Sequence, residues 1–218
     1  MTSVPRPTTL VLFGWPGSGK GTLAELLSAE GFVHLSTGQA MRTWSTGSRP
    51  EQKALAADLA KGIYGSDALA LQIVREFIAG LPAGSPGVLL DGFPRTMPQF
   101  EAWRAAAIKS RALFVEADAH TCASRLTRRA TCPRDGLARL DAAGRPCLKC
   151  GTTMVVRSDD RDPVVVKGRF ETYERTVGDV VRAWKAAKMP LMNVRNVGSM
   201  AELRASLPSV LAFARSRS

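Results

Sequence analysis

The stretch "GWPGSGKGT", residues 14–22, decides how the rest of the chain is interpreted. It follows a short apolar run rich in β-forming residues, "TTLVLF" (8–13), and leads into "KGTLAELLSAE" (20–30), whose leucines recur at helical spacing. A glycine-rich turn between a strand and a helix directs backbone N–H groups at an anion, and a lysine there adds a positive charge for phosphate. The stretch therefore predicts a phosphate-binding loop.

The loop departs from the commonest pattern at one position. In G-x-x-x-x-G-K-[ST] the residue after the lysine carries a hydroxyl that binds Mg²⁺. Here Gly21 takes that position and Thr22 comes one residue later. The remaining spacing and the strand–helix context disfavour a glycine-rich turn that only joins two elements. The reason for the departure must therefore lie elsewhere in the chain.

The composition limits the class of protein. A chain of 218 residues with 45% apolar content can bury one substantial core, with room for one or two insertions. No run approaches the roughly 18 apolar residues of a membrane span, and the apolar stretch 10–13 is too short for a signal peptide, so we expect a cytoplasmic protein. The net charge of +11 predicts anionic partners but does not choose among nucleic acid, membrane surfaces and phosphorylated small molecules.

Further segments alternate between strand-like and helix-like patterns. "GVLLDGF" (87–93) and "RALFVEA" (111–117) are typical of buried strands, and a helical pattern follows each. Residues 169–188 and 200–214 are also expected to be helical, with Pro208 splitting or kinking the second. This alternation predicts the α/β class, with a parallel sheet covered by helices on both faces.

A second motif, "DGFPRTMPQ" (91–99), gives the loop its context, because both resemble the adenylate kinase family. That family's loop reads G-x-P-G-S-G-K-G-T, with glycine and then threonine after the lysine. Further matches are "HLSTGQAMR" (34–42), "RLTRR" (125–129) and "RSDD" (157–160), and together they cover most of residues 8–175 in the family's order. The unusual loop is therefore interpreted as a family feature.

The resemblance implies an architecture and an activity. It implies a P-loop parallel-sheet core (1–36, 68–130 and 163–218), an insertion that binds the nucleoside monophosphate (37–67) and a lid (131–162). The implied reaction is the reversible transfer of a phosphoryl group from ATP to AMP, giving two ADP, with Mg²⁺ as a cofactor. A lid suits this reaction because excluding water prevents hydrolysis. We expect a monomer, because one chain supplies the whole cleft.

The reaction explains why positive side chains are wanted. The nucleophile is already a phosphate oxygen, so no general base is needed, and the difficulty is to bring two polyanions into line. The resemblance implies that the catalytic cations are Lys20, Arg95, Arg129, Arg157 and Arg169. It implies ATP contacts from Gly17, Ser18, Gly19, Lys20, Gly21, Thr22, Arg125, Arg129 and Gly198. It implies AMP contacts from Thr37, Gly38, Arg42, Ile63, Tyr64, Gly65, Gly92, Phe93, Pro94, Arg95, Gln99, Arg157 and Arg169.

The resemblance also assigns roles within these sets. Arg42 and Arg95 would hold the AMP phosphate, and Arg125 would lie against the ATP adenine. Arg129, Arg157 and Arg169 would clamp the transferring group, oriented by Asp159 and Asp160. The backbone of 63–65 and the Thr37 hydroxyl would line the AMP adenine pocket, and the Gln99 amide would read this base. Asp91 would hold Mg²⁺ through water.

Some of these positions are less regular. Arg128 stands where the family usually has glycine, and counting forward to Cys132 selects Arg129 as the phosphate ligand. Arg169 is reached by allowing one extra residue after Arg157. Gln39 stands where the family usually has Asp, and Arg195-Asn196 replaces the Asp-Gly that precedes the ATP adenine loop. These two departures put nucleotide affinity and donor choice in doubt.

The cysteines predict a second site. Cys132 and Asp135 share their spacing with Cys147 and Cys150, and paired C-x-x-C-like knuckles suit tetrahedral Zn²⁺ with carboxylate as an acceptable ligand. The family has a zinc-bearing lid, but this chain has Asp second instead of last and a shorter loop between the pairs. Asp141 or water is therefore an alternative fourth ligand. Cys122 is expected to be a core thiol.

Two other functions remain open at this point. One is a kinase for another nucleoside monophosphate, although Gln99 and the long lid disfavour UMP and CMP. The other is a zinc-ribbon nucleic-acid-binding protein that uses the P-loop as a switch. Aromatic residues make up 6% of the chain, with no stacking pattern among the basic residues, so we expect no nucleic-acid partner and no membrane partner.

Overall fold

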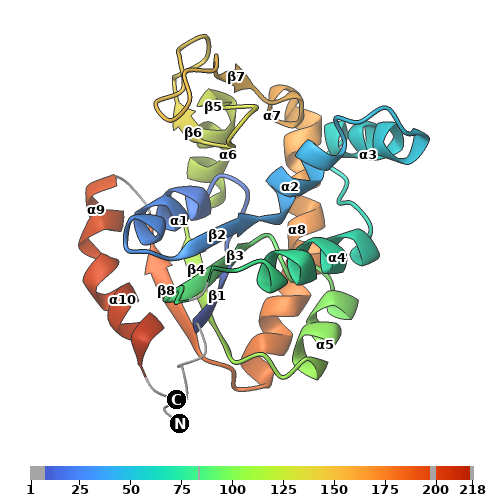
Figure 1. The fold of residues 1–218 in the computed structure, drawn as a ribbon. Helices are drawn as coiled ribbons and strands as arrows, with labels where there is room; N and C mark the ends of the chain where they lie inside the picture. The colour runs from blue at the N-terminus through green and yellow to red at the C-terminus, as the bar shows by residue number, and fades with distance from the viewer. Residues whose placement is uncertain (1–7, 83, 197–199, 217–218) are drawn as a thin grey trace.

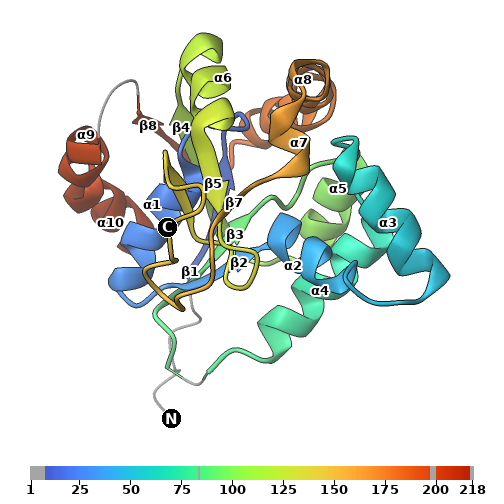
Figure 2. The same ribbon diagram turned by 90° about the horizontal axis from the view of Figure 1, so that it is seen from above.

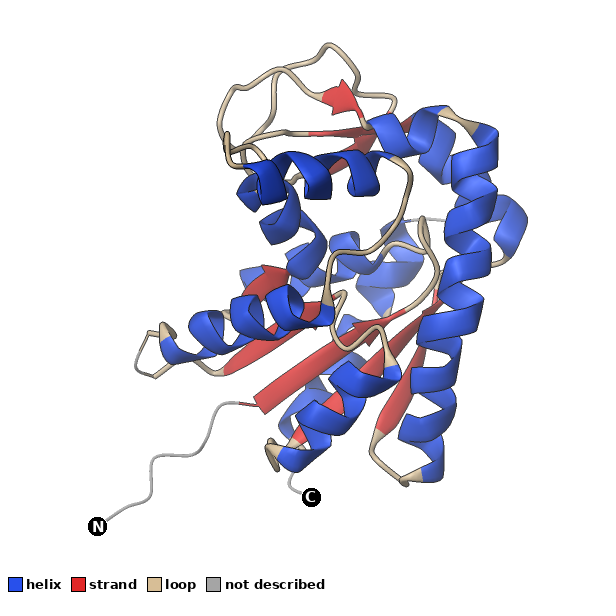
Figure 3. Cartoon of the chain, turned by 90° about the vertical axis from the view of Figure 1, so that its right-hand side faces the viewer, coloured by secondary structure: helices blue, strands red, loops and turns tan. Residues whose placement is uncertain are grey.

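The computed structural model of the chain describes residues 8–82, 84–196 and 200–216. Its centre is a parallel sheet of five strands in the order β2 (Val33–Ser36), β3 (Gly87–Asp91), β1 (Thr8–Phe13), β4 (Ser110–Glu116) and β8 (Leu191–Arg195). Helices cover both faces of this sheet (Figure 3). The α/β class predicted from the alternation is confirmed.

The two faces of β1 show how the sequence builds two cores. Leu10 and Leu12 point to one face, and Val11 and Phe13 point to the other, as the two-residue period of a strand requires. The leucine face packs against α1 (Lys20–Ala29), α9 (Met200–Ala205) and α10 (Leu207–Arg215). The opposite face packs against α4 (Asp67–Ala79), α5 (Met97–Ala105) and α8 (Pro163–Ala186), as Figure 1 shows.

Several element boundaries have clear local causes. The helix expected over 169–188 begins earlier, at Pro163, because the Asp162 side chain accepts a hydrogen bond from the N–H of Val164 and proline suits the first helical turn. The helical pattern over 200–214 is interrupted between Ala205 and Leu207, so the expected break near Pro208 is confirmed. Proline lacks the N–H needed inside a helix but is accepted at its start.

The remaining elements lie at the carboxyl end of the sheet. Two helices, α2 (Thr37–Trp44) and α3 (Pro50–Ala60), project from β2 toward one side, and α6 (Ala119–Arg128) rises from β4. Residues beyond α6 form a small antiparallel sheet, β6 (Ala138–Leu140), β5 (Arg129–Thr131) and β7 (Val155–Val156), followed by α7 (Ser158–Arg161). Figure 2 looks down on this layer. This layer of helices and short strands covers the edge of the sheet where ligands bind in open α/β folds.

No helix among the described residues is both long and apolar enough to span a bilayer.

Candidate active site

The glycine-rich loop joins β1 to α1 as predicted. Gly14, Gly17 and Gly19 all have positive φ angles, of 143°, 83° and 99°. A Cβ on Gly17 would lie 2.4 Å from the carbonyl oxygen of Cys122, so this turn excludes a side chain by space as well as by backbone conformation. The Lys20 Nζ donates to the carbonyl oxygens of Gly14 and Trp15, at 2.5 and 2.9 Å. The lysine therefore curls back over the loop, and burial lowers its pKa to about 8.

The loop opens into a cavity of about 610 Å³, a size typical of small-molecule sites. Its walls are strongly cationic. They include Lys20, Arg42, Arg95, Arg125, Arg129, Arg139, Arg157, Arg169 and Arg204, against the carboxylates of Asp91 and Asp159. An excess of positive side chains in a partly enclosed space favours a polyanionic ligand.

Most of the residues that the sequence assigned to nucleotide contacts line this cavity. Among the described ones, Ser18, Thr37, Phe93 and Gln99 do not line it. Gly198 lies outside the described residues. Thr37 instead donates from its hydroxyl to the carbonyl oxygens of Asp91 and Gly92, at 3.1 and 2.7 Å, and so joins the start of α2 to the end of β3.

Three arginines of the cavity are held by two neighbouring carboxylates. Asp160 is fully buried and accepts from Arg129 through two hydrogen bonds of 2.9 Å and from Arg169 at 2.5 Å. Asp159 pairs with Arg157 through two oxygens. Burial, followed by the charge of Arg157, lowers the pKa of Arg129 to about 10. The two carboxylates thus hold three guanidinium groups close together, although these positive charges repel one another.

The adjacent arginines 128 and 129 differ in exposure and in whether they line the cavity. Arg129 faces the cavity, with its side chain 19% exposed. Arg128 points outward, with its side chain 54% exposed, and pairs with Asp141 on the lid. Arg129 is therefore the one placed to meet a ligand in the cavity.

Another part of the cavity wall carries Arg42 and Arg95. Arg42 donates through Nε and Nη2 to the Oε1 of Gln39, at 3.2 and 3.1 Å. Burial, followed by the charge of Arg157, lowers the pKa of Arg42 to about 9. The guanidinium of Arg95 lies over the ring of Tyr64, 4.4 Å from the ring centroid. Both arginines approach Gly38 at the start of α2.

Gln99 lies behind this wall and is 3% exposed. Its Oε1 accepts from the backbone N–H of Arg95 at 2.7 Å, and its Nε2 donates to Asp67 at 2.7 Å. The amide that was expected to read adenine thus has two protein partners in this structure. It fixes the backbone of Arg95 to α4.

The end of β8 meets the phosphate-binding loop directly. Asn196 donates from Nδ2 to the carbonyl oxygen of Ser18 at 2.6 Å, and Arg125 donates to the carbonyl oxygen of Asn196 at 3.2 Å. A Cβ on Gly19 would lie 2.2 Å from the Asn196 amide nitrogen. Arg195-Asn196, which replaces the Asp-Gly of the family, therefore gives the chain a polar side chain, that of Asn196, which holds the phosphate-binding loop.

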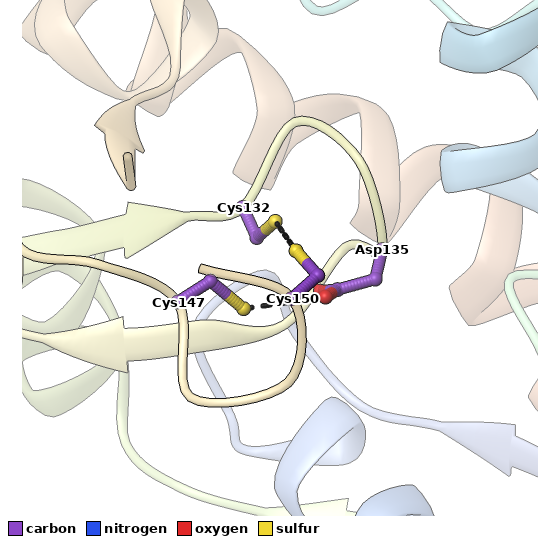
Figure 4. Close-up of side chains that lie close together, drawn as sticks. All are labelled: Cys132, Asp135, Cys147 and Cys150. Atoms are coloured by element: carbon purple, nitrogen blue, oxygen red, sulfur yellow. Dashed lines mark hydrogen bonds between the residues drawn. The ribbon is translucent and has the colours of Figure 1, made fainter. Parts of the chain in front are cut away.

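Four side chains in the lid form a compact cluster suited to a metal ion. Cys132, Asp135, Cys147 and Cys150 bring one donor atom each within 4.8 Å of one another (Figure 4). The Cys132 and Cys150 sulfurs are 3.5 Å apart, close to the roughly 3.8 Å that tetrahedral zinc–sulfur bonds require. Asp141, the alternative fourth ligand, is paired with Arg128 instead. Cys122 is fully buried below the phosphate-binding loop.

Comparison with known proteins decides the family. A family model described as adenylate kinase matches residues 12–189. A curated adenylate kinase of Xanthobacter autotrophicus is 33% identical over 212 residues, covering 94% of this chain and 98% of its own length. One from Trichlorobacter lovleyi is 29% identical over 93% of this chain and 98% of its own length. The chain belongs to the adenylate kinase family.

Adenylate kinases are nucleoside monophosphate kinases that transfer a phosphoryl group between ATP and AMP, and the chain is an enzyme of this class. The resemblance drawn from "GWPGSGKGT" and "DGFPRTMPQ" is therefore confirmed. Gly21, the irregular position of the loop, would have no neighbour within 4 Å of an added Cβ, so packing does not impose glycine there.

The adenylate kinase motifs did not reveal every residue of the cavity. Arg139 in β6 and Arg204 in α9 line it, and neither falls in a motif. Arg139 makes a bidentate ion pair with Glu25 in α1, at 2.9 and 2.7 Å. The alternation of β6 carries no recognisable signal because the strand has three residues.

Proposed function

We propose that the chain catalyses reversible, Mg²⁺-dependent phosphoryl transfer from ATP to AMP, giving two ADP. The observation that carries the proposal is that Arg129, Arg157 and Arg169 line one cavity together with Arg42, Arg95 and the phosphate-binding loop. The two sets of cations suit the triphosphate of ATP and the single phosphate of AMP as they approach each other, because phosphoryl transfer depends on alignment and charge neutralisation.

Each group then has a defined part. Lys20 and the loop N–H groups bind the ATP phosphates, and the arginines held by Asp159 and Asp160 stabilise the transferring group. Such preorganised charges act most strongly where water is excluded. Arg42 and Arg95 hold the acceptor phosphate, whose own oxygen attacks, so no side chain has to remove a proton.

Adenine recognition and the magnesium ion involve residues at the sheet edge. We propose that Gln99 reads the AMP base by exchanging its hydrogen bond with Asp67 for one with adenine. Asp91 lies at the carboxyl end of β3, lines the cavity and is partly exposed, which suits a carboxylate that holds Mg²⁺ through water. When bound, the ion supplies positive charge to the phosphates.

Lid closure forms part of the proposal. The ion pair between Arg139 and Glu25 joins the lid strand β6 to α1, and Gln39 of α2 contacts the turn at Gly136. These contacts favour a closed lid that keeps water from the transferring phosphoryl group. The cysteine cluster would hold Zn²⁺, which orders the lid because the segment has few large apolar side chains of its own.

An assay of ATP with each of AMP, GMP, CMP and UMP tests the proposal. We expect AMP to be the preferred acceptor, with ADP formed from both nucleotides and activity lost when Mg²⁺ is chelated. A preference for another monophosphate would identify a different kinase of this class. No phosphoryl transfer, together with ATP-dependent binding to single-stranded DNA or RNA, would overturn the proposal in favour of a nucleotide-switched nucleic-acid-binding protein.

A further inference from the structure

Arg95 differs from four other arginines of the cavity in the group that holds its side chain. Arg129, Arg157 and Arg169 donate to the carboxylates of Asp159 and Asp160, and Arg42 donates to Gln39. Within 8–82, 84–196 and 200–216, the guanidinium of Arg95 has no hydrogen bond and no ion pair. Its partner is the Tyr64 ring, at 4.4 Å from the ring centroid.

Small residues make this stacking possible. A Cβ on Gly92 would lie 2.3 Å from a guanidinium nitrogen of Arg95, so the guanidinium rests close to the backbone at the end of β3. A Cβ on Gly65 would lie 2.9 Å from the sulfur of Met41 and 3.0 Å from Leu55. Glycine at 65 therefore lets the chain pass close to α2 and α3, and Tyr64 next to it reaches the cavity wall.

The chemistry of stacking explains why a ring is useful here. A guanidinium has five N–H donors in its plane, and a carboxylate partner occupies some of them. An aromatic ring attracts the face of the guanidinium and leaves the donors at its edge free. A phosphate binds at that same edge, often through two parallel hydrogen bonds. The ring can thus orient Arg95 without competing with a phosphate ligand.

We propose that the Tyr64 side chain is a positioning residue that holds Arg95 ready for the phosphate of the acceptor nucleotide. This inference rests on the proposed function, in which Arg95 binds that phosphate. The ring acts before the nucleotide arrives, so it lowers the concentration of acceptor needed for half-saturation and leaves the transfer step unchanged. The hydroxyl of Tyr64 makes no hydrogen bond among the described residues, so the ring alone carries the effect.

Two substitutions at this position separate the ring from the rest of the side chain. In Tyr64→Leu we expect the KM for AMP to rise about three- to tenfold, the range expected for losing a partly desolvated cation–π contact. The kcat and the KM for ATP should stay within about twofold of the wild type. Tyr64→Phe keeps the ring and should restore the KM for AMP to within about twofold.

A double-mutant cycle and a control complete the experiment. In an Arg95→Ala background, Tyr64→Leu should leave the KM for AMP unchanged, because the group that it positions is gone. Arg49→Ala removes an arginine that lies over Trp44, 5.4 Å from the ring, in the same insertion but away from the cavity, and should leave all constants unchanged.

The outcomes distinguish this inference from the function on which it rests. A wild-type chain that does not phosphorylate AMP contradicts the proposed function. If the wild type is active and Tyr64→Leu keeps its KM for AMP, or Tyr64→Phe is impaired as strongly as Tyr64→Leu, the positioning role is wrong. An equal rise in the KM values for AMP and ATP would show a general loss of structure and would also overturn it.

Discussion

The buried carboxylate of Asp160 offers a sharp test of how the cavity arginines are held. It accepts two hydrogen bonds from Arg129 and one from Arg169. Asp160→Asn preserves the shape of the side chain but removes its charge. Losing one partner of a buried ion pair costs about 3–5 kcal/mol, and each 1 kcal/mol lowers the Tm by roughly 2–4 °C in a chain of this size. We therefore expect the Tm to fall by about 6–20 °C.

Calorimetry with and without saturating ADP should show a second effect. A bound phosphate can supply the negative charge that the variant lacks, so ADP should raise the Tm of Asp160→Asn more than that of the wild type. Asp141→Asn is the matched control, because Asp141 also pairs with an arginine but is exposed. Its Tm should stay within about 2 °C of the wild type. Equal Tm losses in the two variants would refute the reasoning.

Further predictions concern the loop, the lid and the base. Lys20→Ala should lower kcat/KM by about a hundredfold or more, measured in a coupled assay. Because burial lowers the pKa of Lys20 to about 8, the lysine loses its charge as the pH rises through 8, and kcat/KM for ATP in the wild type should fall there. The free energy of unfolding should respond in the opposite direction. Between about pH 8 and 10.5 only the unfolded chain keeps the proton on Lys20, so the contribution of this lysine to stability rises with pH. Elemental analysis should find about one zinc per chain, and Cys147→Ser should lower both zinc content and Tm while residual activity remains. Gln99→Leu should weaken the preference for AMP over GMP and UMP more than it changes ATP affinity; an equal loss for every acceptor would show that Gln99 only fixes Arg95.

The phosphate-binding loop could be predicted because its structure is determined locally. The glycines of 14–19 need positive φ angles, and the strand before them and the helix after them have clear periodicity. The same holds for β3 and β4, strands of five and seven residues that each contain four consecutive buried residues. Motif residues such as Arg95 then follow at the carboxyl ends of these strands.

Other features depend on contacts between distant residues and left no local signal. The lid strands have two or three residues each, and they are specified by pairing with one another instead of by their own pattern. One hydrogen-bond partner of Gln99 is Asp67, 32 residues away, and the ion-pair partner of Arg139 is Glu25, 114 residues away. Tyr64 looked like part of the pocket backbone, and its ring acquires a role only once Arg95 lies over it.

The ion pair between Arg139 and Glu25 has a consequence for how the enzyme responds to its medium. Both side chains are about one third exposed, at 35% and 31%, so dissolved ions reach them. Exposed charges are screened progressively as ionic strength rises, with a Debye length of about 10 Å at 0.1 M and about 3 Å at 1 M. In the cysteine cluster, Cys132 and Cys147 are buried, so screening affects their contacts far less. Salt should therefore loosen the contact between β6 and α1 while leaving the cysteine cluster intact. In the closed lid that we propose, ionic strength would then set how long the nucleotides stay enclosed.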